Sequence, residues 1–197
     1  NGMEITAAMV KELRSQSGAG IMECKSALKE TQGDLEEAIT FLRKKGLAKA
    51  DKKSDRQTSE GVIGSYIHQG SKVGVMLELN CETDFVANTP DFQTLVKDIA
   101  MHIAAAKPRF ATREEVTEGV LEKEREIFAH QAKESGKPEN IIEKIVTGKM
   151  EKFYEENCVL EQPFIKDTNV TIGELIKQKI ALLGENINIG QFSRFEI

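Results

Sequence analysis

The sequence predicts an α+β fold, in which a small amino-terminal three-helix bundle precedes a core of three to four mostly antiparallel strands packed with helices. Apolar residues recur at helical spacing through the first fifty residues. Two runs with alternating apolar residues then flank Gly70-Ser71, which is typical of a β-hairpin. Helical spacing returns after Pro90. Together these patterns indicate a helical module at residues 3–46, a charged linker helix at 47–60 and an α+β core domain at 61–197.

The amino-terminal module is expected to contain three short helices, each of which follows a capping or turn residue and ends at a glycine. The expected limits are Thr6 to Gly18, Gly20 to Gly33, and Asp34 to Gly46. Residues 47–60 are charged and hold few large apolar side chains, so we expect a solvated helix or linker there.

The core domain is expected to alternate strands with helices. Its apolar stripe at residues 92–103 follows the i, i+3, i+4, i+7 pattern of an amphipathic helix. The expected strands are 62–69, 73–80, 158–165 and 186–196, and the expected helices are 90–106, one after the Thr112 and Glu115 capping pair, one after Pro138, and one from Thr171 to Gly184.

Composition excludes several classes of protein. Hydrophobic residues make up 40% and charged residues 30% of the chain, which is ordinary for a soluble domain. We recognise no membrane span and no signal peptide, so we expect a cytoplasmic protein that binds no membrane. The net charge of −5 argues against direct nucleic-acid binding. The basic stretch from Arg43 to Arg56 lacks aromatic residues and favours a solvated helix over an RNA-binding arm.

Motifs for chemistry are absent from the sequence. It contains no glycine-rich phosphate loop, and its histidines stand apart, so we expect no catalytic residue, no cofactor and no metal. Cys24, Cys81 and Cys158 are expected to be buried free thiols. Cys81 with His68 could form a nucleophile and its base, but a small buried residue at a strand end is favoured by roughly five to one.

Two apolar features remain for which a structural and a functional interpretation are about equally favoured. Phe85 stands in the connector between the strand at 73–80 and the helix at 90–106, where its ring either folds into the core or faces a partner. Ile21 and Met22 are adjacent at a helix start, and they point about 100° apart, so we expect one of them to be exposed.

Three segments of the chain, in order between Ile5 and Ile189, carry a family resemblance. They read VKELRSQSGAGIMECKSALKETQGDLEEAI, ELNCETDFVA and LLGENINI. These segments resemble, in turn, the amino-terminal module, the core signature and the end of the last helix in the bacterial elongation factor Ts family. The module of that family is itself similar to ubiquitin-associated (UBA) domains.

The resemblance implies a function in protein biosynthesis, as a guanine nucleotide exchange factor for the GTPase elongation factor Tu. It implies no enzymatic chemistry. The segment Thr83, Asp84, Phe85 and Val86 would enter the GTPase beside its bound magnesium, with Phe85 as a wedge, so that GDP leaves and GTP rebinds. The resemblance also implies partner contacts at Arg14, Ile21 and Met22 in the module, and at Leu183 and Gly184 at the end of the last helix.

The chain departs from the family pattern in ways that affect its expected partners. Ile21 stands where many members have methionine, and Gly190-Gln191 replace a basic pair. A single core half ends at Ile197, as in short members, which implies a noncovalent homodimer. An alternative interpretation is a non-enzymatic adaptor, whose UBA-like module binds a protein without exchange activity.

Overall fold

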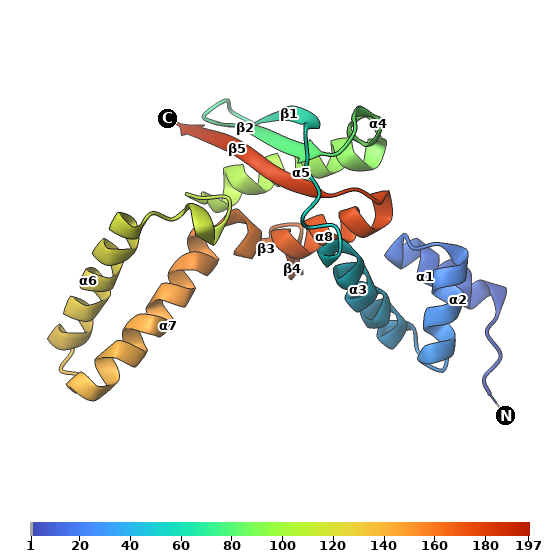
Figure 1. Ribbon diagram of the computed structural model, residues 1–197, viewed down its shortest axis with the longest axis horizontal. Helices are drawn as coiled ribbons and strands as arrows, with labels where there is room; N and C mark the ends of the chain where they lie inside the picture. The colour runs from blue at the N-terminus through green and yellow to red at the C-terminus, as the bar shows by residue number, and fades with distance from the viewer. Residues whose placement is uncertain (1) are drawn as a thin grey trace. The chain divides into compact units, whose positions relative to one another are not determined.

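The computed structural model describes residues 2–197 and contains two compact units (Figure 1). Unit 1 combines the chain up to Gly61 with Asn80–Gln93 and Ile176–Asn188. Unit 2 combines Val62–Leu79, Thr94–Leu175 and Ile189–Ile197. Helices and strands are both present in the described chain, so the predicted α+β class is confirmed. The predicted domain division at residues 46 and 60 stays a prediction.

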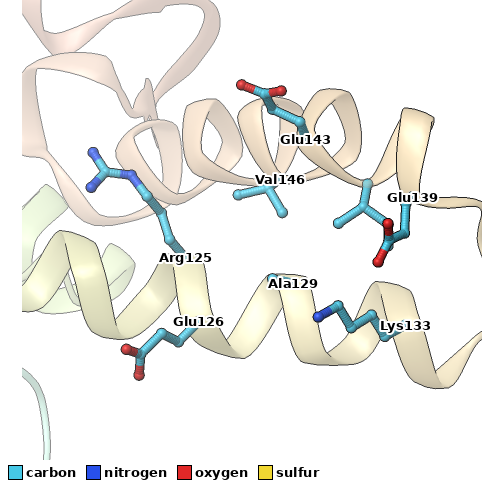
Figure 2. Close-up of a pocket in the computed structure, with 8 residues that line it drawn as sticks. Arg125, Glu126, Ala129, Lys133, Glu139, Glu143 and Val146 are labelled. Carbon is cyan, nitrogen blue, oxygen red and sulfur yellow. The ribbon is translucent and has the colours of Figure 1, made fainter.

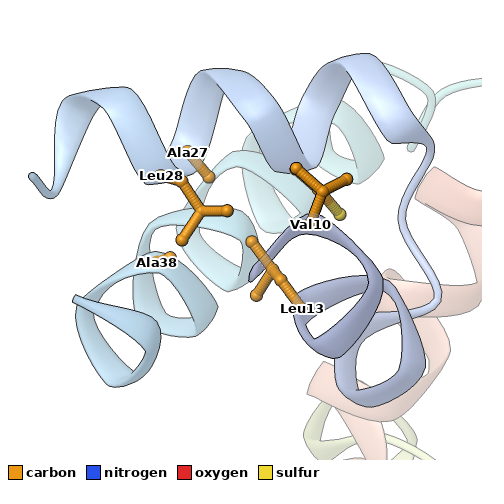
Figure 3. Packing of buried hydrophobic residues seen from close by; sticks show 6 residues of the cluster. Val10, Leu13, Ala27, Leu28 and Ala38 are labelled. Carbon is orange, nitrogen blue, oxygen red and sulfur yellow. The ribbon is translucent and has the colours of Figure 1, made fainter. Parts of the chain in front are cut away.

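The amino-terminal bundle of unit 1 contains α1 (Ala7–Ser17), α2 (Ile21–Glu30) and α3 (Leu35–Asp51). Figure 3 shows its core, where Val10 and Leu13 of α1 meet Ala27 and Leu28 of α2 and Ala38 of α3. The predicted start and end of α1 are confirmed. Thr6 accepts a hydrogen bond from the Met9 amide at 3.2 Å, and Gly18 ends the helix with a φ of 70°.

The predicted end of the third helix at Gly46 is wrong, because α3 continues to Asp51. A helix-ending glycine adopts positive φ, and Gly46 does not. A Cβ atom on Gly46 would lie 3.6 Å from the Cβ atom of Ala181, so Gly46 lies inside a helix contact in unit 1. Helix α3 therefore continues through a glycine into the segment that was expected to be a solvated helix or linker.

The main sheet contains β1 (Glu60–Ile67), β2 (Val73–Cys81) and β5 (Ile187–Glu196), in the order β1-β2-β5. The predicted hairpin is confirmed, since the His68 amide donates to the Val73 carbonyl at 2.9 Å. The Ile197 amide donates to the Lys72 carbonyl at 2.9 Å, so β5 ends where β2 begins and runs antiparallel to it.

Helix α5 (Pro90–Ala106) covers one face of this sheet in unit 2 (Figure 1). Val75, Leu77 and Leu79 alternate along β2 and are buried. A Cβ atom on Gly64 of β1 would overlap Val96 of α5, so glycine permits this close approach. The predicted bounds of α5 are confirmed.

Helices α6 (Glu118–Glu134) and α7 (Glu139–Asn157) form an antiparallel hairpin in unit 2 (Figure 1). The expected cap at Thr112 is wrong. Residues Arg113–Glu115 form a short 3₁₀ helix, η1, and Thr117 caps α6 by accepting from the Val120 amide. The Glu115 side chain instead accepts from the Ala111 amide at 3.0 Å.

The strand expected at residues 158–165 is mostly wrong. Val159–Glu161 form a 3₁₀ helix, η2, and only Pro163–Phe164 form a strand, β3, which pairs with β4 (Asp167–Thr171). Val159 and Phe164 are buried, and the Val159 and Leu160 amides donate to the carbonyls of Phe110 and Ala111 instead of to a neighbouring strand. Local alternation cannot distinguish such burial from a strand.

The last helix, α8 (Ile172–Leu183), begins and ends as predicted. Thr171 accepts from the Glu174 amide at 3.1 Å, and Gly184 ends the helix with a φ of 79°. Within residues 2–197, no helix is both long and apolar enough to cross a membrane.

Candidate functional site

The connector that was expected after β2 contains a one-turn helix, α4 (Asp84–Ala87). Thr83 caps it by accepting from the Val86 amide at 3.3 Å. The Asn88 amide donates to the Asp84 carbonyl at 3.0 Å and closes the turn. The backbone that carries Asp84 and Phe85 is therefore defined by hydrogen bonds.

Phe85 is 82% exposed, so its ring faces solvent and does not belong to the core. Val86 and Ala87 follow it on the same turn and are buried. Their burial holds α4 against the core. Asp84 is also exposed. We call Asp84 and Phe85 the tip. The tip combines an apolar ring with a carboxylate on one short turn, a combination suited to contact with a partner.

Two carboxylates link the tip to the segment after α8, which lies in the same unit. Glu185 accepts from Thr83 twice, from its amide at 3.0 Å and from its hydroxyl at 2.7 Å. Glu82 accepts from the Asn186 amide at 2.7 Å. Each segment therefore supplies one carboxylate to the other.

The segment after α3 joins the same network. The buried Asn186 side chain donates to the Arg56 carbonyl at 2.8 Å, and Arg56 lies 3.6 Å from the Glu82 carboxylate. The segment after α3 thus meets the two segments that carry the tip and the end of α8 at one set of hydrogen bonds in unit 1.

The amino-terminal bundle presents a second apolar surface. Ile21 is 50% and Met22 is 76% exposed, so both side chains face solvent where only one was expected to. Arg14 is also exposed. Next to this surface, the hydrogen bond from Lys49 lowers the pKa of the Glu23 carboxyl, and this ion pair joins α2 to α3.

The end of α8 contributes a third exposed area. Gly184 is exposed, whereas Leu183 is half-buried. Its neighbour Leu182 is exposed and was not singled out from the sequence. The structure therefore brings the tip and the end of α8 together through Glu185. Leu182 belongs to the last turn of α8.

Comparison with known proteins identifies the family. The sequence model of one protein family, described as Elongation factor TS, matches residues 3–197. The chain belongs to the elongation factor Ts family. An elongation factor Ts from Fervidobacterium nodosum is 60% identical over 195 residues, which cover 99% of both chains. One from Solibacter usitatus is 58% identical over 194 residues, which cover 98% of this chain and 92% of that relative. Members of this family are translation elongation factors, so the protein acts in protein biosynthesis.

The thiol chemistry considered from the sequence has no structural support. His68 pairs with Val73 at one end of β2, whereas Cys81 is at the other end of that strand. Burial raises the pKa of the Cys81 thiol, and the thiol donates to the Thr83 carbonyl at 3.1 Å. Burial likewise raises the pKa of Cys158 to about 11. All three cysteines are buried free thiols, as predicted.

Small-molecule and metal sites also lack support in the described part of the chain. No group of three metal-ligating side chains occurs among residues 2–197. A groove runs between α6 and α7, with Ala129 and Val146 along it and charged side chains at its edges (Figure 2). Arg125, Lys133 and Glu143 at its edges are exposed, unlike the convergent buried polar groups of a ligand pocket.

Glu82, Glu185 and Asn186 were not identified as functional from the sequence. They stand inside the segments ELNCETDFVA and LLGENINI, but the hydrogen bonds that join them to other segments span 102 to 132 residues of the chain. The sequence offered one signal for the two glutamates: Glu82 directly precedes the proposed contact residue Thr83, and Glu185 directly follows Gly184. Only the folded chain shows which amide each carboxylate meets.

Proposed function

We propose that the protein is a guanine nucleotide exchange factor that binds elongation factor Tu·GDP and promotes GDP release by binding alone. The exposed ring of Phe85, mounted on a capped turn, is the single observation that carries this proposal. A ring in this position is free to enter a partner without disturbing the factor's own core. Family membership supports the same function.

The mechanism follows from coupling between two binding events. A GTPase holds GDP largely through phosphate and magnesium contacts. An exchange protein that prefers the nucleotide-free GTPase must weaken the binding of the nucleotide to the GTPase. The nucleotide must weaken the binding of the exchange protein by the same ratio. Insertion of Asp84 and Phe85 near the magnesium site would disturb these contacts. Burial of one phenylalanine contributes about 1.5 to 3 kcal/mol, or about tenfold to hundredfold in affinity.

The other proposed contacts supply the rest of the binding free energy. The UBA-like module would hold the GTPase through Arg14, Ile21 and Met22, and the end of α8 would contact it through Leu183 and Gly184. Thr83 and Val86 support the tip, since one caps α4 and the other is buried beneath it. No cofactor and no covalent step is required, so the protein is not an enzyme in the ordinary sense.

The proposed setting is the cytoplasm, with a noncovalent homodimer as the working form. The outer face of the main sheet, opposite α5, supports the dimer because it exposes several large apolar side chains. Nucleic acid and membrane are not proposed as partners.

Stopped-flow release of a fluorescent GDP from elongation factor Tu tests the proposal. We expect Phe85→Ala to slow stimulated release by about tenfold or more, and Asp84→Ala to slow it less. Unchanged release with Phe85→Ala would refute the wedge. A parent protein that binds the GTPase without accelerating release would instead support the adaptor interpretation.

A further inference from the structure

Glu185 restrains the residue on which α4 is built. Its Oε1 atom accepts from the Thr83 amide at 3.0 Å, and its Oε2 atom accepts from the Thr83 hydroxyl at 2.7 Å. The Thr83 hydroxyl also accepts from the Val86 amide, so one hydroxyl connects the carboxylate to the first turn of α4. A carboxylate that accepts from two donors of one residue fixes its orientation as well as its position.

This restraint acts at the start of α4, whereas the Asn88 amide and side chain, which both donate to the Asp84 carbonyl, close the end of the turn. A single helical turn is not stable by itself, since nucleation fixes several dihedral angles for one hydrogen bond. Phe85 is exposed and cannot be held by its own packing. Burial of Val86 and Ala87 anchors the end of the turn, whereas Thr83 and Glu185 determine its start.

We propose that Glu185 is a positioning residue that directs the Asp84–Phe85 tip toward the nucleotide site of the GTPase. This inference rests on the proposed function. Glu185 follows the end of α8, which itself carries two proposed partner contacts, Leu183 and Gly184. One side chain therefore joins the end of α8 to the tip, so that binding of the GTPase at α8 presents the tip in a fixed direction.

Positioning and docking have different kinetic consequences. A misdirected tip lowers the GDP release rate at saturating factor, whereas a lost docking contact raises the factor concentration needed for half-saturation. For Glu185→Ala we expect the saturating rate to fall about tenfold or more, because both hydrogen bonds from Thr83 to the charged carboxylate are lost. We expect the half-saturating concentration to change by less than about twofold.

The experiment measures stimulated GDP release over a range of factor concentrations for three variants. Glu185→Ala removes both acceptors. Glu185→Gln retains one acceptor oxygen, so its saturating rate should lie between those of Glu185→Ala and the parent. Glu122→Ala, which changes an exposed carboxylate on α6, is the matched control and should behave as the parent. A parent-like saturating rate for Glu185→Ala would overturn the inference.

Amide hydrogen exchange by NMR gives a readout that does not depend on the GTPase. In Glu185→Ala the Thr83 amide should exchange at least about tenfold faster, while the Val75 and Leu77 amides in β2 remain protected. Unchanged exchange at Thr83 would show that Glu185 does not hold the tip. If Phe85→Ala slows release and Glu185→Ala does not, this inference fails while the proposed function stands. If Phe85→Ala has no effect, the proposed function fails first.

Discussion

Lys177 Nζ lies 2.9 Å from Asp51 Oδ1, and this ion pair joins α8 to the last residue of α3. Both side chains are largely exposed, so the pair contributes only about 0 to 1 kcal/mol. Together with the contact between Gly46 and Ala181, the ion pair shows that α3 and α8 pack against each other. Helix α3 thus extends from the bundle core to α8, and residues 47–51 are helical where a linker was an open alternative.

Gly46→Ala should stabilise the protein. Gly46 is inside α3, where alanine is favoured over glycine by about 1 kcal/mol. The added Cβ atom would lie 3.6 Å from Ala181, an ordinary van der Waals contact. We expect urea unfolding to show a gain of about 0.5 to 1 kcal/mol in the free energy of unfolding.

Gly64→Ala is the contrasting control for this prediction. Its Cβ atom would overlap the buried and conformationally stiff Val96 side chain, so a loss of about 1 to 3 kcal/mol is expected. A loss of stability in Gly46→Ala would mean that α3 and α8 are packed too tightly at this point for a methyl group.

Phe85→Ala should leave stability unchanged within about 0.5 kcal/mol, because the ring is exposed. Phe92→Ala is a matched control in α5, since its ring is completely buried and its removal should cost about 3 to 5 kcal/mol. Thermal and urea unfolding of both variants provide the comparison. A large loss in Phe85→Ala would show that the ring has a structural role, and slower GDP release could then not be attributed to the wedge.

Met22→Ala should weaken binding to the GTPase without changing the GDP release rate of the bound complex. Met22 is exposed and belongs to the proposed contact surface of the amino-terminal module. We expect the half-saturating factor concentration to rise about tenfold, the size of one lost apolar contact, while the saturating GDP release rate stays at the parent value. A lower saturating rate would indicate that the module also takes part in opening the nucleotide site.

The sequence predicted those elements whose boundaries are marked by local chemistry. Thr6, Thr171 and Gly184 define helix ends through their own backbone and hydroxyl groups, and the structure confirms each one. The turn at Gly70-Ser71 is equally local, with positive φ at both residues. Such signals need no knowledge of the rest of the fold.

Other features depend on contacts between distant segments and could not be predicted. The continuation of α3 through Gly46 depends on Ala181, and the burial of Val159 without a strand depends on hydrogen bonds to residues 110 and 111. At the candidate site, the exposure of Phe85 stayed an even choice until the buried Val86 showed which face of α4 is inward. Glu185 was missed because its partner Thr83 is 102 residues away.

His102 should make stability depend on pH. Its ring is buried, with Nδ1 accepting from the Ile165 amide at 3.3 Å and Nε2 lying 2.9 Å from the side-chain Oε1 atom of Gln162. The neutral ring with hydrogen on Nε2 satisfies both partners, and burial lowers the pKa of His102 below its usual value of 6.5. Below pH 6.5 the His102 side chain binds a proton in the unfolded chain but not in the folded chain. The free energy of unfolding therefore falls as pH falls.

Urea unfolding at pH 7 and pH 5.5 measures this effect. The parent should lose about 1 kcal/mol more over this interval than His102→Asn, which cannot be protonated. His130→Asn, the same replacement at an exposed position on α6, is the control. Equal losses for the parent and His102→Asn would assign the pH dependence to other groups.

The outer face of the main sheet should form the proposed homodimer interface. Residues on this face alternate with inward ones: Met76 lies between the buried Val75 and Leu77, and Phe195 follows Arg194, whose guanidinium donates to the Ala104 carbonyl of α5. Phe195 is 72% exposed. The large apolar side chains exposed along the three strands are Ile63, Ile67, Met76 and Phe195, with Ile197 directly after β5.

Replacement of Ile63 and Phe195 together by serine should therefore convert a dimer into a monomer in sedimentation equilibrium. The double variant should remain folded, because neither side chain belongs to the core. Phe85→Ala removes an equally exposed phenylalanine from unit 1 and should leave the dimer intact. A dimer that survives the double substitution must use another surface. A parent protein that sediments as a monomer at micromolar concentration would refute the homodimer itself and leave this apolar face for a different partner.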